Sequence, residues 1–269
     1  MKIFLIVLPL IAVVSAPAGA VEIRPATTAA FDLYAAGLEA KYAARRGAEH
    51  YITFADTPER LTQMKAGTVL ARPGDGTGEI AIPGGIIHHY VGGFFLPGVS
   101  IKQALASIQD YNKHKVNFAP DIVDSVIRSH KTPDDFQLYM RIVKSKMMVT
   151  DVLNTEHDIH WIYPNDKRAY CRSVTTKVAE VENAGKPNEK ELPVGNDRGI
   201  VWRMNSYWFL EEKDGGVYVE HASVTLSRDL PFVLSKVLGP ILHSVPIETQ
   251  KGSLEKCKKA ILATAGKTS

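Results

Sequence analysis

Large apolar and aromatic residues flank Asp214-Gly215 on both sides, within WRMNSYWFLEEKDGGVYVEHASVTLSR (202–228). Such residues indicate strands, and an Asp-Gly pair between them is typical of a two-residue hairpin turn. With that turn, the predicted pairs are Lys213 with Gly216, Phe209 with Glu220, Trp208 with His221, and Arg203 with Leu226. A slip of one residue would exchange the faces, so the register decides what each side chain contacts.

Apolar residues recur every three or four positions in three other parts of the chain, which predicts helices. The first helix covers FDLYAAGLEAKYAARR (31–46), and the second, VSIKQALASIQDY (99–111), begins with Ser100 as its N-cap. The third part comprises DLPFVLSKVLGPILHSV (229–245) and SLEKCKKAILATA (253–265). Pro240 lacks an amide hydrogen and clashes with the preceding turn, so a kink or break is expected near Gly239.

Runs rich in β-branched and aromatic residues predict the remaining strands. They are IIHHYVGGFFLPG (86–98), FQLYMRIVKSKMMVTDVLN (136–154), HDIHWIYP (157–164) and RAYCRSVTTKVAEVEN (168–183). Between the first two runs, NFAPDIVDSVIRSH (117–130) is expected to form a short helix or turn after Pro120. This order predicts an α+β fold in which a curved antiparallel sheet wraps around a long C-terminal helix and leaves a cavity between them.

Three stretches then support a family resemblance: GGIIHHYVGGFFLPGVS, ELPVGNDRGIVWRMNSYWF and GGVYVEHASVTLSRDLP. They resemble a group of exported bacterial proteins within the START-like, or Bet v 1-like, superfamily, which also includes polyketide cyclase-like proteins. The similarity extends from about Gly84 to Leu262. It implies the helix-grip fold and a role with lipids, sterols or other hydrophobic molecules, but it transfers no catalytic residue set to this chain.

The chain is divided into three predicted parts. Residues 1–20 combine Lys2, an apolar run and the small residues Ala18 and Ala20, which is the pattern of a signal peptide cleaved near Ala20. An N-terminal extension with a helix follows at 21–83, and the START-like domain occupies 84–269. The expected location is therefore the periplasm or the exterior of the cell.

Charge and candidate ligands exclude several function classes. The sequence has 32 basic and 29 acidic residues, which lacks the basic excess of a nucleic-acid-binding protein. His88 and His89 are adjacent and His157 and His160 are three apart, so on strands each pair points to opposite faces. We therefore expect no metal and no cofactor. The pairing of the two cysteines, Cys171 and Cys257, stays open because sequence cannot show their separation.

The candidate ligand-binding residues come from the hairpin and the last helix. Arg203 lies on the same face of the hairpin as Glu220, where it can hold an anionic head group. The alternatives are a structural ion pair or an outward, solvated face. The opposite face is strongly apolar. The predicted neighbourhood of the ligand comprises Trp202, Arg203, Tyr207, Trp208, Glu220, Leu254 and Ile261.

These residues predict a non-catalytic protein that binds a lipid or other hydrophobic small molecule, with transient contact to a membrane. Two alternatives stay open. One is an enzyme of the polyketide cyclase or hydrolase type, which a cluster of polar side chains deep in the cavity would favour. The other is an envelope assembly protein that docks a partner through the helix at 31–46, which a cavity filled by side chains would favour.

Overall fold

The computed structural model describes residues 21–146, 149–229 and 232–266, and only the backbone of Val21, 144–146, 149–150 and 232–246. One large antiparallel sheet dominates it, with strand order β2-β4-β12-β11-β8-β7-β6-β5. The strands are β2 (Leu70–Pro73), β4 (Gly85–Pro97), β5 (Ile122–Thr132), β6 (Asp135–Lys146), β7 (Val149–Asn165), β8 (Arg168–Glu182), β11 (Arg203–Lys213) and β12 (Gly216–Ser227). Short strands add β3 (Glu79–Ile82) to β4 and β9 (Lys190–Glu191) to β8, while β1 (Val21–Glu22) pairs with β10 (Asn196–Asp197).

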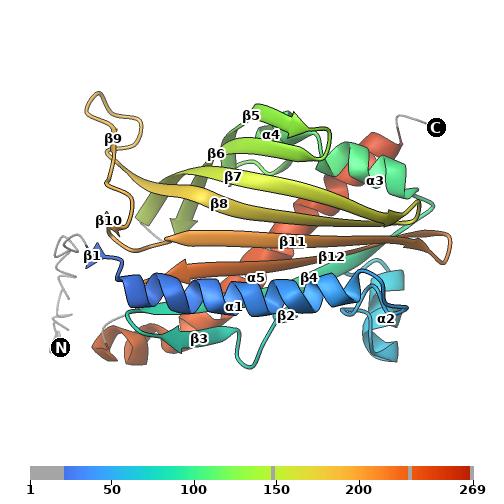
Figure 1. Cartoon of the computed structure of the whole chain (residues 1–269), viewed down its shortest axis with the longest axis horizontal. Helices are drawn as coiled ribbons and strands as arrows, with labels where there is room; N and C mark the ends of the chain where they lie inside the picture. The colour runs from blue at the N-terminus through green and yellow to red at the C-terminus, as the bar shows by residue number, and fades with distance from the viewer. Residues whose placement is uncertain (1–20, 147–148, 230–231, 267–269) are drawn as a thin grey trace, which may run out of the picture.

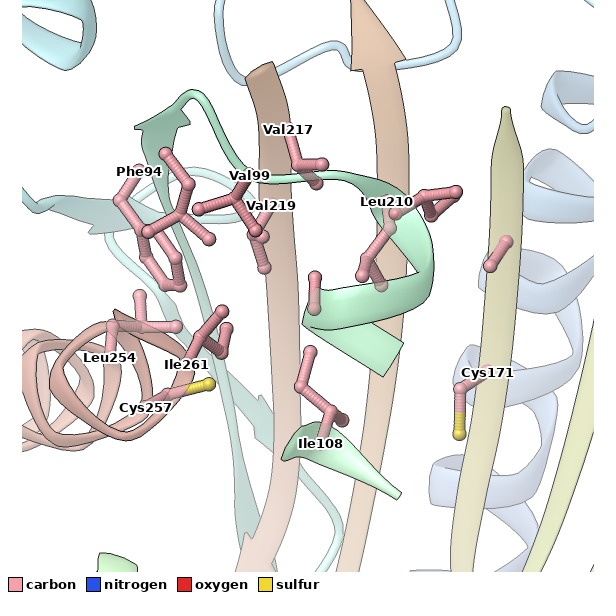
Figure 2. Close-up of a cluster of buried hydrophobic side chains, with 14 of the residues drawn as sticks. Phe94, Val99, Ile108, Cys171, Leu210, Val217, Val219, Leu254, Cys257 and Ile261 are labelled. Atoms are coloured by element: carbon pink, nitrogen blue, oxygen red, sulfur yellow. The ribbon is translucent and has the colours of Figure 1, made fainter. Parts of the chain in front are cut away.

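Two long helices cover opposite faces of the sheet (Figure 1). The helix α5 (Phe232–Ala265) crosses one face, where Leu254, Cys257 and Ile261 join the buried cluster of Phe94 and Val219 (Figure 2). The helix α1 (Pro25–Arg45) lies along the other face. We call these two sides the α5 face and the α1 face.

The α1 face has a hydrophobic cluster of its own. Phe31, Ala35 and Tyr42 of α1 pack there against side chains of β4, β11 and β12. The tyrosine ring meets the rings of Tyr207 and Phe209 edge to face, each at a centroid distance of 5.1 Å. Such aromatic contacts add to the free energy of burial, so α1 is an integral layer of the molecule.

The predicted hairpin register is confirmed. Lys213 pairs with Gly216, and every expected pair outward to Arg203 with Leu226 is present. The turn residues Asp214 and Gly215 have φ of 56° and 75°, as a type I′ turn requires.

The helices between β4 and β5 also follow the sequence signals. The side chain of Ser100 caps α3 (Ile101–Ile108) and forms a capping box with Gln103. After α3 come a 3-10 turn, η1 (Tyr111–Lys113), and the single-turn helix α4 (His114–Asn117). Before β2, the helix α2 (Pro58–Lys65) is capped in the same way by Thr57.

Three predicted boundaries are wrong. The segment after Pro120 is not a helix or turn, because β5 begins at Ile122 and pairs with β6 through several register shifts. The run expected at 136–154 contains nearly all of β6 and the start of β7, and β7 continues through the run expected at 157–164. One helix, α5, replaces the two expected segments at the C-terminal end, and the side chains around the kink predicted near Gly239 lie outside the described residues.

The predicted α+β helix-grip fold is confirmed by this arrangement, in which a curved antiparallel sheet packs around the C-terminal helix. The boundary between residues 83 and 84 stays a prediction. In the structure, β2 and β3 from the expected extension are hydrogen-bonded to β4 of the same sheet.

Candidate ligand-binding site on the α5 face

The seven candidate residues are divided between the two faces of the sheet. Trp208, Leu254 and Ile261 belong to the cluster on the α5 face. Trp202 and Tyr207 belong to the cluster on the α1 face, and Glu220 and Arg203 lie on that side by alternation along the hairpin. Only Trp208, Leu254 and Ile261 therefore lie on the side of the sheet that α5 covers.

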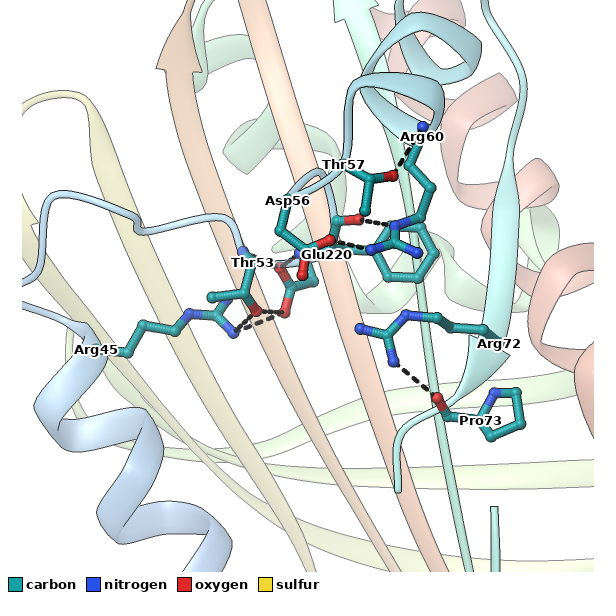
Figure 3. Close-up of polar contacts among 9 residues, drawn as sticks. Arg45, Thr53, Asp56, Thr57, Arg60, Arg72, Pro73 and Glu220 are labelled. Atoms are coloured by element: carbon teal, nitrogen blue, oxygen red, sulfur yellow. Dashed lines mark hydrogen bonds and ion pairs between the residues drawn. The ribbon is translucent and has the colours of Figure 1, made fainter. Parts of the chain in front are cut away.

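Glu220 holds the N-terminal part of the chain on the sheet (Figure 3). Its carboxylate is 1% exposed and accepts hydrogen bonds from the Arg45 guanidinium at 2.7 Å and from the backbone amides of Thr53 and Phe54, both at 2.9 Å. The same guanidinium lies 3.5 Å from the centroid of the Phe209 ring. Both carboxylate oxygens of Glu220 are thus occupied within the protein, so this ion pair is structural.

The other candidates on the α1 face are also engaged within the protein. The hydroxyl of Tyr207 donates to Glu39 of α1 at 2.9 Å, and the indole of Trp202 donates to Asp197 at 2.9 Å. Arg203 donates to the backbone carbonyl of Trp202 at 3.1 Å. None of these contacts faces α5.

Small hydroxyl side chains occupy the α5 face beside its apolar cluster. The strand pairings place Ser206 of β11 between Ser173 of β8 and Ser223 of β12. In the next row, Met204 is opposite Thr225, and its backbone amide donates to the Thr175 hydroxyl at 2.9 Å. His157 of β7 is opposite Thr175. Because side chains directly opposite each other lie on one face, these rows form a continuous floor. We call these two rows, across β7, β8, β11 and β12, the hydroxyl floor.

The exposure of the hairpin shows that this part of the α5 face is open. Met204, Ser206, Trp208, His221, Ser223 and Thr225 are all partly exposed. The residues between them, which point to the α1 face, are buried: Asn205, Tyr207, Ala222, Val224 and Leu226. The small side chains of the floor therefore leave accessible space, while the large side chains on the other face fill theirs.

His157, at one end of the floor, is buried and neutral. The Thr155 hydroxyl donates its hydrogen to the Met140 carbonyl at 3.1 Å. The hydroxyl oxygen of Thr155 can then only accept from His157, so Nε2–H of His157 donates to it at 2.9 Å. The other ring nitrogen, Nδ1, then accepts from Ser173 at 3.5 Å. Burial lowers the pKa of His157 to about 4. Both nitrogens are occupied, so this histidine anchors the floor.

His221 lies on the same face of β12, one row beyond the floor, and within the described part of the chain its Nε2 has no partner. The side-chain amide of Gln250 in α5 donates both to the His221 carbonyl at 3.2 Å and to Nδ1 at 2.8 Å. Because Nδ1 accepts, the ring proton of neutral His221 is on Nε2. Burial lowers the pKa of His221 to about 3, and its ring lies 4.1 Å from that of Trp208.

Neither the two cysteines nor, in the part of the chain that the structure describes, a metal site or a membrane-spanning helix adds a group to the floor. Cys171 and Cys257 are both buried free thiols, and burial raises the pKa of Cys257 to about 12. Among the described residues, no group of histidine, cysteine, aspartate and glutamate has the geometry of a metal site. Nor does any helix there have the length and apolarity needed to cross a membrane.

An open groove lies outside the sheet, where α5 passes the turn before β2. This open groove has a volume of about 690 Å³ and is bordered by Gly67, Val69, Lys258 and Leu262, among others. Lys258 donates to the Gly67 carbonyl at 2.6 Å, which fixes one wall. None of the seven candidate residues borders it.

Comparison with known proteins yields structures only. No protein-family model matches the chain, and no curated protein has a significantly similar sequence. A STAR-related lipid transfer protein from Xanthomonas axonopodis is 14% identical, with 68% of this chain and 98% of that chain covered and a TM-score of 0.47. The human StarD13 lipid transfer and protein localization domain is 8% identical over 80% of this chain and 98% of its own, with a TM-score of 0.44. The Zhui aromatase/cyclase from a Streptomyces species is 10% identical over 65% of this chain and 96% of its own, with a TM-score of 0.37.

The chain has a helix-grip fold. This statement rests on the strand order and the position of α5. The solved structures say nothing about a ligand or an activity, because their TM-scores are below 0.5 and their identities below 15%. The START-like resemblance of the sequence motifs and the arrangement of sheet and α5 agree.

Sequence reasoning missed the hydroxyl floor. Its signal was present in the hairpin, where Ser206, Ser223 and Thr225 occupy alternate positions that point to one face. The large aromatic residues Tyr207 and Phe209 lie on the opposite face, where side chains of α1 pack against them. Only the position of α1 separates the packed face from the open one.

Proposed function

We propose that this START-like protein binds a lipid or another hydrophobic small molecule between the sheet and α5, without catalysis. The observation that carries the proposal is the partly exposed floor of small side chains on the α5 face, next to an apolar cluster. Accessible concave space with apolar walls and a few polar groups is typical of small-molecule sites. Of the seven residues predicted from sequence, Trp208, Leu254 and Ile261 remain in its neighbourhood.

Native mass spectrometry tests this proposal. We expect the purified protein to carry an apolar molecule that organic extraction removes, or to take one up from a lipid extract of its own cells. A protein that is empty and takes up nothing would contradict the proposal and favour an assembly role through α1.

A cavity-filling variant locates the site. Ser206→Leu puts three carbon atoms in place of a hydroxyl on the floor, and we expect it to abolish uptake while the protein remains folded. Thr176→Leu is the matched control, because Thr176 is exposed on β8 and lies outside the floor. Uptake that persists in the first variant would place the ligand elsewhere.

A second candidate function is acid–base catalysis on the same floor, which the contact between Ser173 and the buried His157 favours. A general base needs a free nitrogen lone pair, however. Both nitrogens of His157 are occupied, and Nδ1 of His221 accepts from Gln250. These contacts favour binding over catalysis, and unchanged recovery of the extracted ligand after long incubation tests that choice.

We further propose that the protein is exported and that residues 1–20 are removed. The support is the pattern of one basic residue, an apolar run and small residues before position 21. The intact mass of the protein from an envelope fraction should correspond to a chain that begins at Val21. A mass that includes residues 1–20 would overturn this proposal.

A further inference from the structure

We infer that the ligand is an uncharged apolar molecule bearing a hydroxyl or carbonyl oxygen, which is held by the hydroxyls of Ser206 and Ser223 and by Nε2–H of His221. The inference rests on the proposed function and specifies the chemistry recognised at that site. Ser206 and Ser223 are paired across β11 and β12, and His221 is two residues from Ser223 on the same face. Paired residues have Cβ atoms about 4.5–5.5 Å apart, so the three groups converge on one small patch.

The three groups are available for a ligand. Within the described part of the chain, the side chains of Ser206 and Ser223 form no hydrogen bond, and both residues are partly exposed. Nε2–H of His221 is likewise without a partner there, while Gln250 occupies the other ring nitrogen. An imidazole N–H can only donate and a hydroxyl can donate as well as accept, so together they require an oxygen acceptor. A pure hydrocarbon would leave these donors unsatisfied.

The floor is unsuited to an anion. In the rows that carry Ser206, Met204 and Trp208 across β7, β8, β11 and β12, no position is occupied by lysine, arginine, aspartate or glutamate. His221 is neutral at pH 7, because burial lowers its pKa to about 3. Beyond β12, Glu79 lies opposite His88 at the edge of the sheet and adds a negative charge. A carboxylate that loses its water there would gain no cation in return.

This chemistry differs from the one that the sequence predicts for Arg203. The guanidinium of Arg203 was expected to hold an anionic head group, but it lies on the α1 side and donates to the Trp202 carbonyl. The α5 face instead offers uncharged donors. The oxygen of an alcohol, ketone or ester fits these donors without the cost of desolvating a charge.

A displacement experiment with three probes tests the inference. Diphenylhexatriene, a fluorescent hydrocarbon without polar atoms, reports on the apolar space alone. At pH 7.5, 1-decanol and decanoate then compete for it with the same alkyl chain and different head groups. We expect 1-decanol to displace the reporter at a concentration at least about 10-fold lower than decanoate, because only the anion must lose its charge solvation.

Variants connect this preference to the named groups. In Ser206→Ala/Ser223→Ala we expect the affinity for 1-decanol to fall about 10-fold, as the loss of two hydrogen bonds implies, while diphenylhexatriene binds as before. His221→Phe keeps a ring against Trp208, removes the Nε2–H donor and should act in the same direction. Thr176→Ala, outside the floor, should change neither affinity.

The outcomes separate the two proposals. If diphenylhexatriene does not bind, the proposed function fails and the inference falls with it. If the reporter binds but decanoate competes as well as 1-decanol, the inference alone is overturned. The same holds if the double variant keeps the full affinity for 1-decanol.

Discussion

At the scale of single residues, the carboxylate of Glu220 is the strongest link between the N-terminal part of the chain and the sheet. It pairs with Arg45 and accepts two backbone amides while being almost completely buried. Glu220→Gln removes the charge and leaves the guanidinium buried without its partner. We expect the free energy of unfolding, measured with urea at pH 7, to fall by about 3–5 kcal/mol.

The control for this prediction is the same substitution in an exposed ion pair. Glu182 pairs with Lys190 at 3.0 Å, with side chains 48% and 64% exposed. Glu182→Gln should cost less than about 1 kcal/mol, because solvent screens the pair. Equal losses in the two variants would show that Glu220 contributes no more than a surface charge.

The sequence predicts the hairpin register around Glu220 but not its partner. Alternation and the Asp-Gly turn depend on residues a few positions apart, so they can be recognised locally. Arg45 is separated from Glu220 by 175 residues, and no spacing rule connects them. The choice between an ion pair and a ligand clamp therefore required the position of α1.

At the scale of elements, the turn between β11 and β12 depends on backbone conformation. Gly215 has φ of 75°, and a Cβ there would meet no atom within 4 Å. Gly215→Ala should lower the free energy of unfolding by about 1–2 kcal/mol, because the left-handed conformation is unfavourable for a residue with a Cβ. Urea unfolding measures the loss.

Glycine in a helix provides a control with the opposite sign. Gly37 lies within α1, and a Cβ there would also meet nothing within 4 Å. Gly37→Ala should raise the free energy of unfolding by about 0.5–1 kcal/mol through helix propensity. If Gly215→Ala and Gly37→Ala both lowered the free energy of unfolding by similar amounts, contacts rather than backbone conformation would determine both effects.

The elements that the sequence predicts well are those whose start or end is marked by a local sequence signal. Ser100 marks the start of α3, and Asp214-Gly215 ends β11. The segment after Pro120 was misread because its pairing with β6 contains register shifts that interrupt a simple alternation. Strand β7 was misplaced for a related reason, since its 17 residues pass through two runs that composition separates.

At the scale of the whole molecule, the helix-grip arrangement could be predicted, but the covering of the second face could not. The order of strands and the apolar stripe of the last helix imply a sheet around α5. The stripe of Phe31, Leu38 and Tyr42 shows that the first helix packs on something, without showing which face of the sheet receives it. The position of α1 therefore decides which candidate residues lie on the face that α5 covers.

Buried histidines on both faces make the stability of the whole molecule depend on pH. His89 on the α1 face and His157 on the α5 face are 4% and 3% exposed, and burial lowers the pKa of each to about 4. Below the unfolded pKa of about 6.5 the unfolded chain binds protons that the folded chain does not, so stability falls as pH decreases from about 6.5 toward 4. Above that range these two residues cause no change.

The slope of this dependence can be assigned to one residue. Each such histidine contributes about 1.4 kcal/mol per pH unit within the window. His157→Asn removes one titrating group, so we expect the slope of the unfolding free energy between pH 6 and pH 4.5 to decrease by about that amount, whatever the variant costs at pH 7. An unchanged slope, measured by urea unfolding at several pH values, would mean that His157 already binds a proton in the folded protein, and the hydrogen bonds that define the neutral end of the floor would then be wrong.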